Sequence, residues 1–239
     1  MNDFRPSIKG RGRVSFVIVP LLILFSLIFA PKSDAQSWTN LGSGMDYAVS
    51  NLVTDVGGNL YAGGFFTNAG GVLVNGVAKW NGSSWTNLSS GVSGEVFALA
   101  CLTNGNLYAG GSFTNAGGPA ANYVAMWDGV VWNNLSSGMN SYVLALAAGA
   151  NGNIYAGGYF TSAGGLGSNY VAMWDGAAWT NLSSGMDNGV LALAADTNGN
   201  IYAGGYFNTA GGVPANRVAM WNGSTWTNLG SGMNSSVSA

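Results

Sequence analysis

The sequence lacks histidine, contains one cysteine and carries few charges. Without histidine there is no Ser-His-Asp or Cys-His couple, no imidazole metal ligand and no imidazole acid or base. The lone Cys101 excludes an intrachain disulfide framework and a thiolate zinc cluster. Charged residues make up 7% of the chain, against about 25% in ordinary globular proteins. We therefore expect a protein without enzymatic activity, cofactor or metal.

Glycine and apolar residues take the place of the missing charges. The chain of 239 residues has 39 glycines, and 48% of it is hydrophobic. This glycine content is more than twice the usual share of about 7%. Helical periodicity of 3.6 residues is absent, so the composition favours an all-β architecture of small residues.

The N-terminus has the pattern of an export signal. Residues 1–13 carry four of the seven cations, and residues 14–30 are mostly apolar. The small residues Ser33 and Ala35 then precede Gln36, as at a signal-peptidase site. We predict a signal peptide over residues 1–35, cleaved after Ala35, and a secreted or cell-surface protein. The alternative is that residues 14–30 are retained as an anchor, although so short a run is at the lower limit for spanning a bilayer.

Beyond residue 35 the chain is acidic. Its only cations are Lys79 and Arg217, against seven carboxylates. Such a surface offers no electrostatic footprint for a phosphate backbone, so we expect no nucleic-acid partner.

The rest of the chain is one unit repeated every 47 residues. Residues 132–178 and 179–225 are identical at 32 of 47 positions. A fixed period of this length indicates an array of supersecondary units. The period is marked by two tryptophan series: Trp38, Trp85, Trp132, Trp179 and Trp226, and Trp80, Trp127, Trp174 and Trp221. The units are 38–84, 85–131, 132–178, 179–225 and a partial unit 226–239.

Each unit predicts four short strands. The unit from Val190 onward reads as an apolar run 190–194, a turn centred on Asn198-Gly199, and a second strand 201–207. Strands over 217–221 and 225–229 follow, with Asn222-Gly223 as the turn between them. Four antiparallel strands per repeat match one blade of a β-propeller, so we predict four full blades and the start of a fifth. A solenoid is the alternative, but its coils usually have shorter periods.

The repeat resembles known families. The Gly-Gly doublet at the end of the second strand and the tryptophans on the third and fourth strands resemble kelch repeats. The string 108–118, followed by 124–129 and 132–138, is more similar to the kelch-like repeats of fungal cortical polarity-marker proteins and of secreted bacterial proteins. This resemblance covers residues 38–239 and implies a β-propeller without implying an activity. Kelch-like blades also occur in the galactose-oxidase family, whose copper ligands have no counterpart in a chain without histidine.

The phase of the repeat suggests an incomplete ring. We expect residues 38–41 to form an outer strand, and residues 237–239 to begin a first strand. A closed ring would end after a third strand, so we predict the N-terminal part of a longer propeller, with a four-bladed ring with surplus ends as the alternative. An incomplete ring would favour self-association.

Function is expected where the repeats differ. Two connections in each unit vary, and both should open on one face of a propeller, where we predict a protein or glycan ligand. The loop before the first strand supplies Asp46, Glu95, Asn140, Tyr142 and Asp187 as candidates. The start of the third strand supplies Tyr123, Tyr170 and Arg217.

Other residues have simpler explanations. The periodic tryptophans could stack on sugars, but their recurrence favours packing between blades. The segment 196–200 resembles the start of a calcium loop, but two of the four equivalent turns lack the aspartate, which favours a hairpin turn. Cys101 is replaced by alanine in later units and reads as a small buried residue.

Three function classes remain open from the sequence. The leading one is a non-enzymatic binding platform on a secreted or surface propeller. The second is a fragment of a carbohydrate-active propeller enzyme whose catalytic residues lie on further blades. The third is a structural repeat spacer.

Overall fold

The computed structural model describes residues 39–238. The predicted signal peptide, its cleavage site and Trp38 lie outside these residues. The described part contains strands, turns and bends, and no helix in it is long and apolar enough to cross a membrane.

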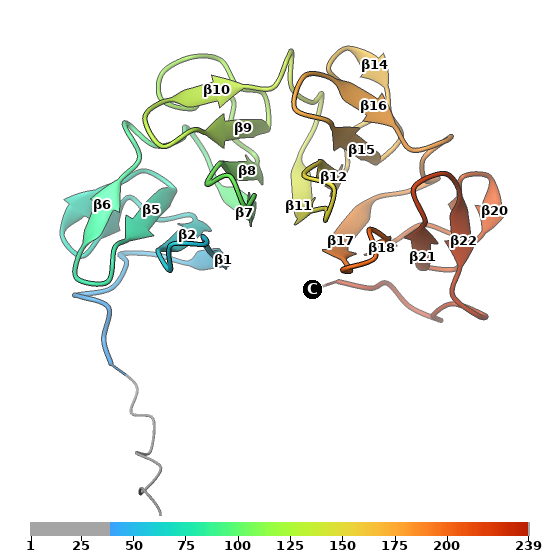
Figure 1. Cartoon of the computed structure of the whole chain (residues 1–239), viewed down its shortest axis with the longest axis horizontal. Coiled ribbons are helices and arrows are strands. Elements are labelled where there is room, and N and C mark those ends of the chain that lie inside the picture. Colours follow the sequence, from blue (N-terminus) through green and yellow to red (C-terminus); the bar gives the residue numbers. More distant parts are fainter. Residues whose placement is uncertain (1–38, 239) are drawn as a thin grey trace, which may run out of the picture. The chain divides into compact units, whose positions relative to one another are not determined.

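Four antiparallel sheets of four strands each follow one another along the chain, as predicted (Figure 1). The first sheet contains β1 (Val49–Thr54), β2 (Leu60–Gly64), β5 (Val77–Trp80) and β6 (Trp85–Asn87). The second contains β7 (Val96–Cys101), β8 (Leu107–Gly111), β9 (Val124–Trp127) and β10 (Trp132–Asn134). The third contains β11 (Val143–Ala148), β12 (Ile154–Gly158), β15 (Val171–Trp174) and β16 (Trp179–Asn181). The fourth contains β17 (Val190–Ala195), β18 (Ile201–Gly205), β21 (Val218–Trp221) and β22 (Trp226–Asn228).

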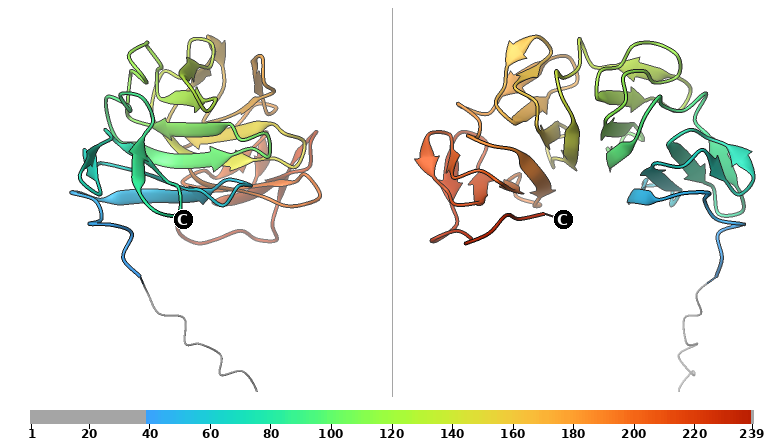
Figure 2. Two further views of the ribbon diagram at one scale, coloured as in Figure 1. Left: turned by 60° about the vertical axis from the view of Figure 1, so that its left-hand side comes forward. Right: turned by 180° about the vertical axis from the view of Figure 1, so that it is seen from behind.

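The sheets are the blades of a β-propeller. Figure 1 and the right view of Figure 2 show them along an arc, with the first strand of each sheet on the inner side and the fourth on the outer side. The inner strands β1, β7, β11 and β17 contact one another in succession. Each blade takes its outer strand from the start of the next repeat, so the blades straddle the boundaries between units.

The register is the same in every blade. In the third blade Ala147 pairs with Tyr155, Tyr155 with Met173, and Trp174 with Trp179. A bulge between Val143 and Ala145 interrupts the first ladder, and equivalent bulges occur in the other three blades.

The inner hairpins of the second, third and fourth blades turn at Asn-Gly pairs, as predicted, and that of the first blade turns at Gly57-Gly58. In the fourth blade Gly199 has a φ of 88°, a conformation that glycine adopts without steric cost. The Asp196 carboxylate accepts hydrogen bonds from the Asn200 side-chain amide and backbone N–H, from the Asn198 backbone N–H and from the Tyr202 hydroxyl. These bonds lower the pKa of Asp196 and account for the aspartate as part of the turn.

The long connection between second and third strands is more ordered than the sequence indicated. It forms a small hairpin in three units: β3 (Asn68–Ala69) with β4 (Val72–Leu73), β13 (Ser162–Ala163) with β14 (Leu166–Gly167), and β19 (Thr209–Ala210) with β20 (Val213–Pro214). In the second unit only an isolated bridge between Asn115 and Ala120 remains. The sequence predicts no strand between the second and third strands of a unit, because two-residue strands are too short to show an alternating pattern.

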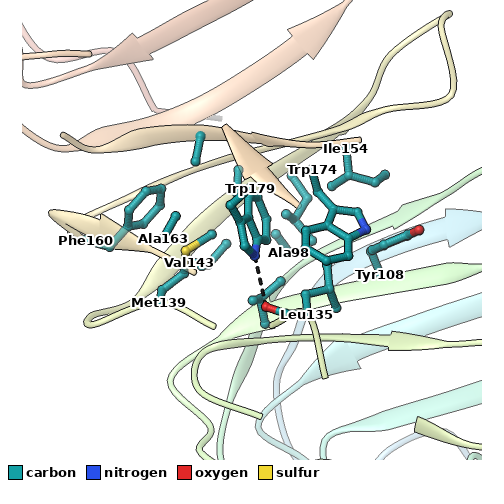
Figure 3. Packing of buried hydrophobic residues seen from close by; sticks show 14 of the residues in the cluster. Ala98, Tyr108, Leu135, Met139, Val143, Ile154, Phe160, Ala163, Trp174 and Trp179 are labelled. Carbon is teal, nitrogen blue, oxygen red and sulfur yellow. Dashed lines mark hydrogen bonds between the residues drawn. The ribbon is translucent and has the colours of Figure 1, made fainter. Parts of the chain in front are cut away.

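Hydrophobic clusters join neighbouring blades. One cluster combines Tyr108 of the second blade with Val143, Phe160 and Trp174 of the third (Figure 3). Figure 3 also shows the indole N–H of Trp179 donating to the carbonyl oxygen of Leu135 at 3.0 Å. The other repeats carry equivalent bonds: Trp85 to Leu41, Trp132 to Leu88, and Trp226 to Leu182. These tryptophans are buried and hold one unit against the next.

The Gly-Gly doublet allows two close approaches. A Cβ atom at Gly158 would overlap the carbonyl oxygen of Tyr142, which directly precedes the paired strand β11. A Cβ atom at Gly157 would meet the side chain of Val190 from the next blade at 2.5 Å. Gly157 therefore leaves room for the neighbouring blade, and Gly158 leaves room for the backbone at Tyr142.

The predicted outer strand over residues 38–41 is wrong for its described part. Residues 39–41 form no strand, because none of the described residues supplies a third strand for them to pair with. At the other end, Val237 lies against Gly204 as Val190 lies against Gly157, and its N–H donates to the Gly205 carbonyl oxygen at 3.3 Å.

Candidate functional site

Two loops of each repeat lie at the same end of the strands. One precedes the first strand of a blade, and the other joins its second and third strands. Isolated bridges connect these loops to each other: Met45 with Ala69, Val92 with Ala116, Met139 with Ala163, and Met186 with Ala210. We call this end the variable face. It consists of residues 44–48 and 65–76 and their equivalents in the other three units.

Three predicted ligand residues on this face are used to hold it together. The Asp46 carboxylate accepts hydrogen bonds from the Thr67 and Asn68 backbone N–H groups, both at 2.9 Å, and from the Thr67 hydroxyl at 2.6 Å. Asn140 and Asp187 accept the equivalent pairs of backbone bonds. The bonds to Asp46 hold its pKa well below the ordinary value. Sequence variation at this position therefore exchanges one hydrogen-bond acceptor for another.

Two predicted aromatics meet where the second and third blades adjoin. Tyr123 and Tyr142 lie with their ring centroids 5.7 Å apart, and Phe97 lies 6.3 Å from Tyr142. Tyr142 is exposed and Tyr123 is half-buried. Glu95, the counterpart of Tyr142 in the preceding unit, accepts a hydrogen bond from the Ser50 hydroxyl of the first blade at 3.3 Å.

Tyr170 and Arg217 do not join the contact between Tyr123 and Tyr142. Tyr123, Tyr170 and Arg217 have φ values of 65°, 65° and 74°, so the position forces a left-handed backbone on each of them. The Arg217 guanidinium donates to the Tyr206 carbonyl oxygen and, at 2.7 Å, to the Asn208 side chain. The structure thus clusters Tyr123 with Tyr142 and leaves the other candidates spread over four blades.

Sequence reasoning missed most of the exposed aromatic residues. All exposed aromatic side chains of residues 39–238 lie on the variable face: Tyr47, Phe65, Tyr142, Tyr159 and Tyr206. Only Tyr142 was singled out from the sequence. The position of Phe65 reads Phe, Ser, Tyr, Tyr along the repeats, so its variation was visible.

A pocket of about 590 Å³ lies on this face between the first two repeats. Tyr47 and Phe65 line it, with their ring centroids 5.4 Å apart and their planes nearly perpendicular. Its polar lining consists of Asp46 and five neutral residues: Thr67, Asn75, Ser90, Ser93 and Asn115. Its volume falls within the range of small-molecule sites, about 300–1,000 Å³.

Groups for other chemistry are sparse in the described part. Residues 39–238 contain no cluster of three or more His, Cys, Asp or Glu side chains able to hold a metal ion. Burial raises the pKa of the Cys101 thiol to about 11, so this thiol is protonated at neutral pH.

Comparisons with known proteins agree with the fold. The family model of a domain of unknown function (DUF5122), described as a beta-propeller, matches residues 197–219. No curated protein matches the sequence.

Several solved structures are similar in fold. The WD40 repeats of RRP9 share 14% identity with a TM-score of 0.53, covering 77% of this chain and 51% of that one. The structure of U3-55K shares 15% identity with a TM-score of 0.57, covering 82% and 55%. The extracellular domain of the two-component system protein BT4673 from B. thetaiotaomicron shares 13% identity with a TM-score of 0.51, covering 80% and 23%.

These likenesses establish the fold. The chain spans about half the length of the first two structures and about a quarter of the third. At such low identity the similarity extends to the fold alone. The chain is an all-β protein with four described β-propeller blades.

Proposed function

We propose that the protein is a non-enzymatic binding platform, secreted or displayed on the cell surface, whose variable face takes a glycan or protein ligand. The observation that carries this proposal is the placement of every exposed aromatic side chain of residues 39–238 on that face. Aromatic side chains bury a large area at low cost in conformational entropy, which makes them effective contact residues.

The opposite face offers a contrast that supports the proposal. Its turns, among them residues 55–59 and 128–131, expose aliphatic side chains such as Val56 and Val130 and no aromatic one. Packing between blades constrains both ends of the repeat. A difference in exposed aromatic side chains between the two ends therefore supports a binding role for the variable face.

The extracellular placement rests on other observations. Residues 1–35 have the pattern of a signal peptide, and one of the similar propellers is an extracellular domain. N-terminal sequencing of the exported protein should find Gln36 first. An intact N-terminus on membrane-bound protein would favour retention of residues 14–30 as an anchor. The kelch-like character of the repeat is part of this proposal.

A binding screen tests the proposed function. The wild-type protein is applied to a glycan array and to a library of extracellular proteins, beside a variant with Tyr47, Phe65, Tyr142, Tyr159 and Tyr206 changed to alanine. A control variant carries Val56→Ala and Val130→Ala on the opposite face. We expect the first variant to lose ligand and the control to keep it. Equal binding by all three proteins would place the ligand elsewhere, and a wild type that binds nothing would favour a structural spacer.

A further inference from the structure

The pocket between the first two repeats lies where glycine occupies two positions that carry side chains in later units. Gly76 stands where the second and third units have Tyr123 and Tyr170. Tyr123 of the second unit packs against Tyr142 of the third, at the corresponding place between those two repeats. Gly94, which lines the pocket beside Gly76, also has no side chain. The first repeat thus leaves open a space that its neighbour closes.

The same repeat lines this space with aromatic rings. Tyr47 is 66% exposed and Phe65 57% exposed, although each touches the other. The equivalents of Tyr47 are Gly94, Ser141 and Asn188, so no other repeat has an aromatic residue at this position. Of the four repeats, only the first combines a glycine at the position of Gly76 with an aromatic residue at the position of Tyr47. A recognition site explains both differences.

The polar groups of the pocket offer no free charge to a ligand. Asp46 is the one charged residue of the pocket, and its carboxylate is occupied by bonds from Thr67 and Asn68. The Asn75 amide N–H donates to the Ser90 carbonyl oxygen at 2.9 Å, which leaves its side-chain oxygen directed to other partners. The Asn115 side chain makes no hydrogen bond with any of residues 39–238. These amides offer both a donor and an acceptor to a ligand.

We infer that this pocket binds a neutral sugar ring, an inference that rests on the proposed binding function and names its ligand class. A pyranose presents an apolar C–H face that packs on aromatic rings and hydroxyl groups that pair with amides and hydroxyls. A charged ligand would find no free counter-charge among the pocket residues, since Asp46 is engaged.

The repeat itself supplies variants that should fold. Gly76→Tyr restores the residue of the next two units at a φ of 78°, close to the 65° at which Tyr123 and Tyr170 stand. Its Cβ would lie 3.0 Å from the Gly94 carbonyl oxygen and the Val92 side chain, so these atoms must move by a few tenths of an ångström. A double variant, Tyr47→Ser with Phe65→Ser, installs residues that Ser141 and Ser112 already provide at these positions. Tyr170→Gly is the matched control on the third unit.

The test uses an array of neutral and acidic oligosaccharides and titration calorimetry with the neutral oligosaccharide that binds best. We expect the wild type to bind neutral sugars, Gly76→Tyr and the double serine variant to lose affinity at least tenfold, and Tyr170→Gly to bind as the wild type does. If both pocket variants bound that sugar with wild-type affinity, the inference that the sugar binds in this pocket would be wrong. The proposed binding function would not be affected. Binding of proteins or acidic sugars alone would overturn the ligand class, and binding of neither sugar nor protein would overturn the proposed function itself.

Discussion

The first and third blades have the same strand pattern but different surroundings. Leu146 in β11 is 9% exposed because the second blade covers it, whereas its counterpart Leu52 in β1 is 58% exposed. Val143 and Val49 differ in the same way, at 0% and 42%. Contact between blades, rather than the strand pattern, therefore determines which of these residues form the core. The first blade also carries the opened pocket on the variable face, so it differs from its neighbours in two places.

The largest expected effect is on a buried leucine. Leu146→Lys should destabilise the protein by about 3 kcal/mol or more, because it places an unpaired charge between blades. Leu52→Lys should change stability by less than about 0.5 kcal/mol, as is usual for exposed positions. Denaturant unfolding of both variants measures the difference. Equal losses would mean that β1 is also covered in solution.

Glycine at the contact between blades gives the next effect. Gly157→Val should cost about 1–3 kcal/mol, since the new side chain would collide with Val190 of the fourth blade. Gly167, in the small hairpin of the same unit, has open space around it, so Gly167→Val should be nearly neutral. Thermal unfolding compares the two variants. An unchanged melting temperature for Gly157→Val would argue against close packing of these blades.

The hydrogen bonds of the tryptophans allow the third and first blades to be compared with a smaller change of side chain. Trp179→Phe removes the bond to the Leu135 carbonyl oxygen, which is buried, and should cost about 1–3 kcal/mol. Trp85→Phe removes the bond to Leu41, an exposed residue whose carbonyl oxygen water can reach, and should cost less. Urea midpoints rank the two variants, and the reverse order would contradict the assignment.

The smallest expected effect depends on pH. Hydrogen bonds lower the pKa of folded Asp46 below its unfolded value, so the ionised group stabilises the fold above about pH 4. This contribution is lost as the pH falls through the folded pKa. Asp46→Asn should therefore show a flatter loss of stability below pH 4 than the wild type. Asn140→Asp is the converse variant in the third unit and should make the loss of stability below pH 4 steeper. The same pH dependence of stability in the wild type and both variants would show that ionisation at this position does not stabilise the fold.

The sequence predicted the architecture because the repeat displays the same signals many times. The Asn198-Gly199 turn, the glycine doublet and the paired tryptophans each mark a strand end, and the fixed period aligns them across blades. The extra hairpins, such as β3 with β4, escaped prediction because each strand has two residues.

The site was harder to predict than the fold. Asp46 and Asn140 vary between repeats, yet both accept the same backbone bonds, and only coordinates reveal this equivalence. Conversely, Phe65 is equivalent to Tyr206 in the predicted second strand, and its exposure is a property of the folded surface. Variation between repeats pointed to the variable face without separating its structural residues from its exposed ones.

The most direct test of this account is hydrogen–deuterium exchange of the wild-type protein with and without the neutral oligosaccharide that binds best on the array. The account predicts protection of the loops 44–48, 65–76 and 90–94 around the pocket, and unchanged exchange in the turns 55–59 and 128–131 on the opposite face. Protection of those opposite turns, with no change around Tyr47 and Phe65, would contradict it.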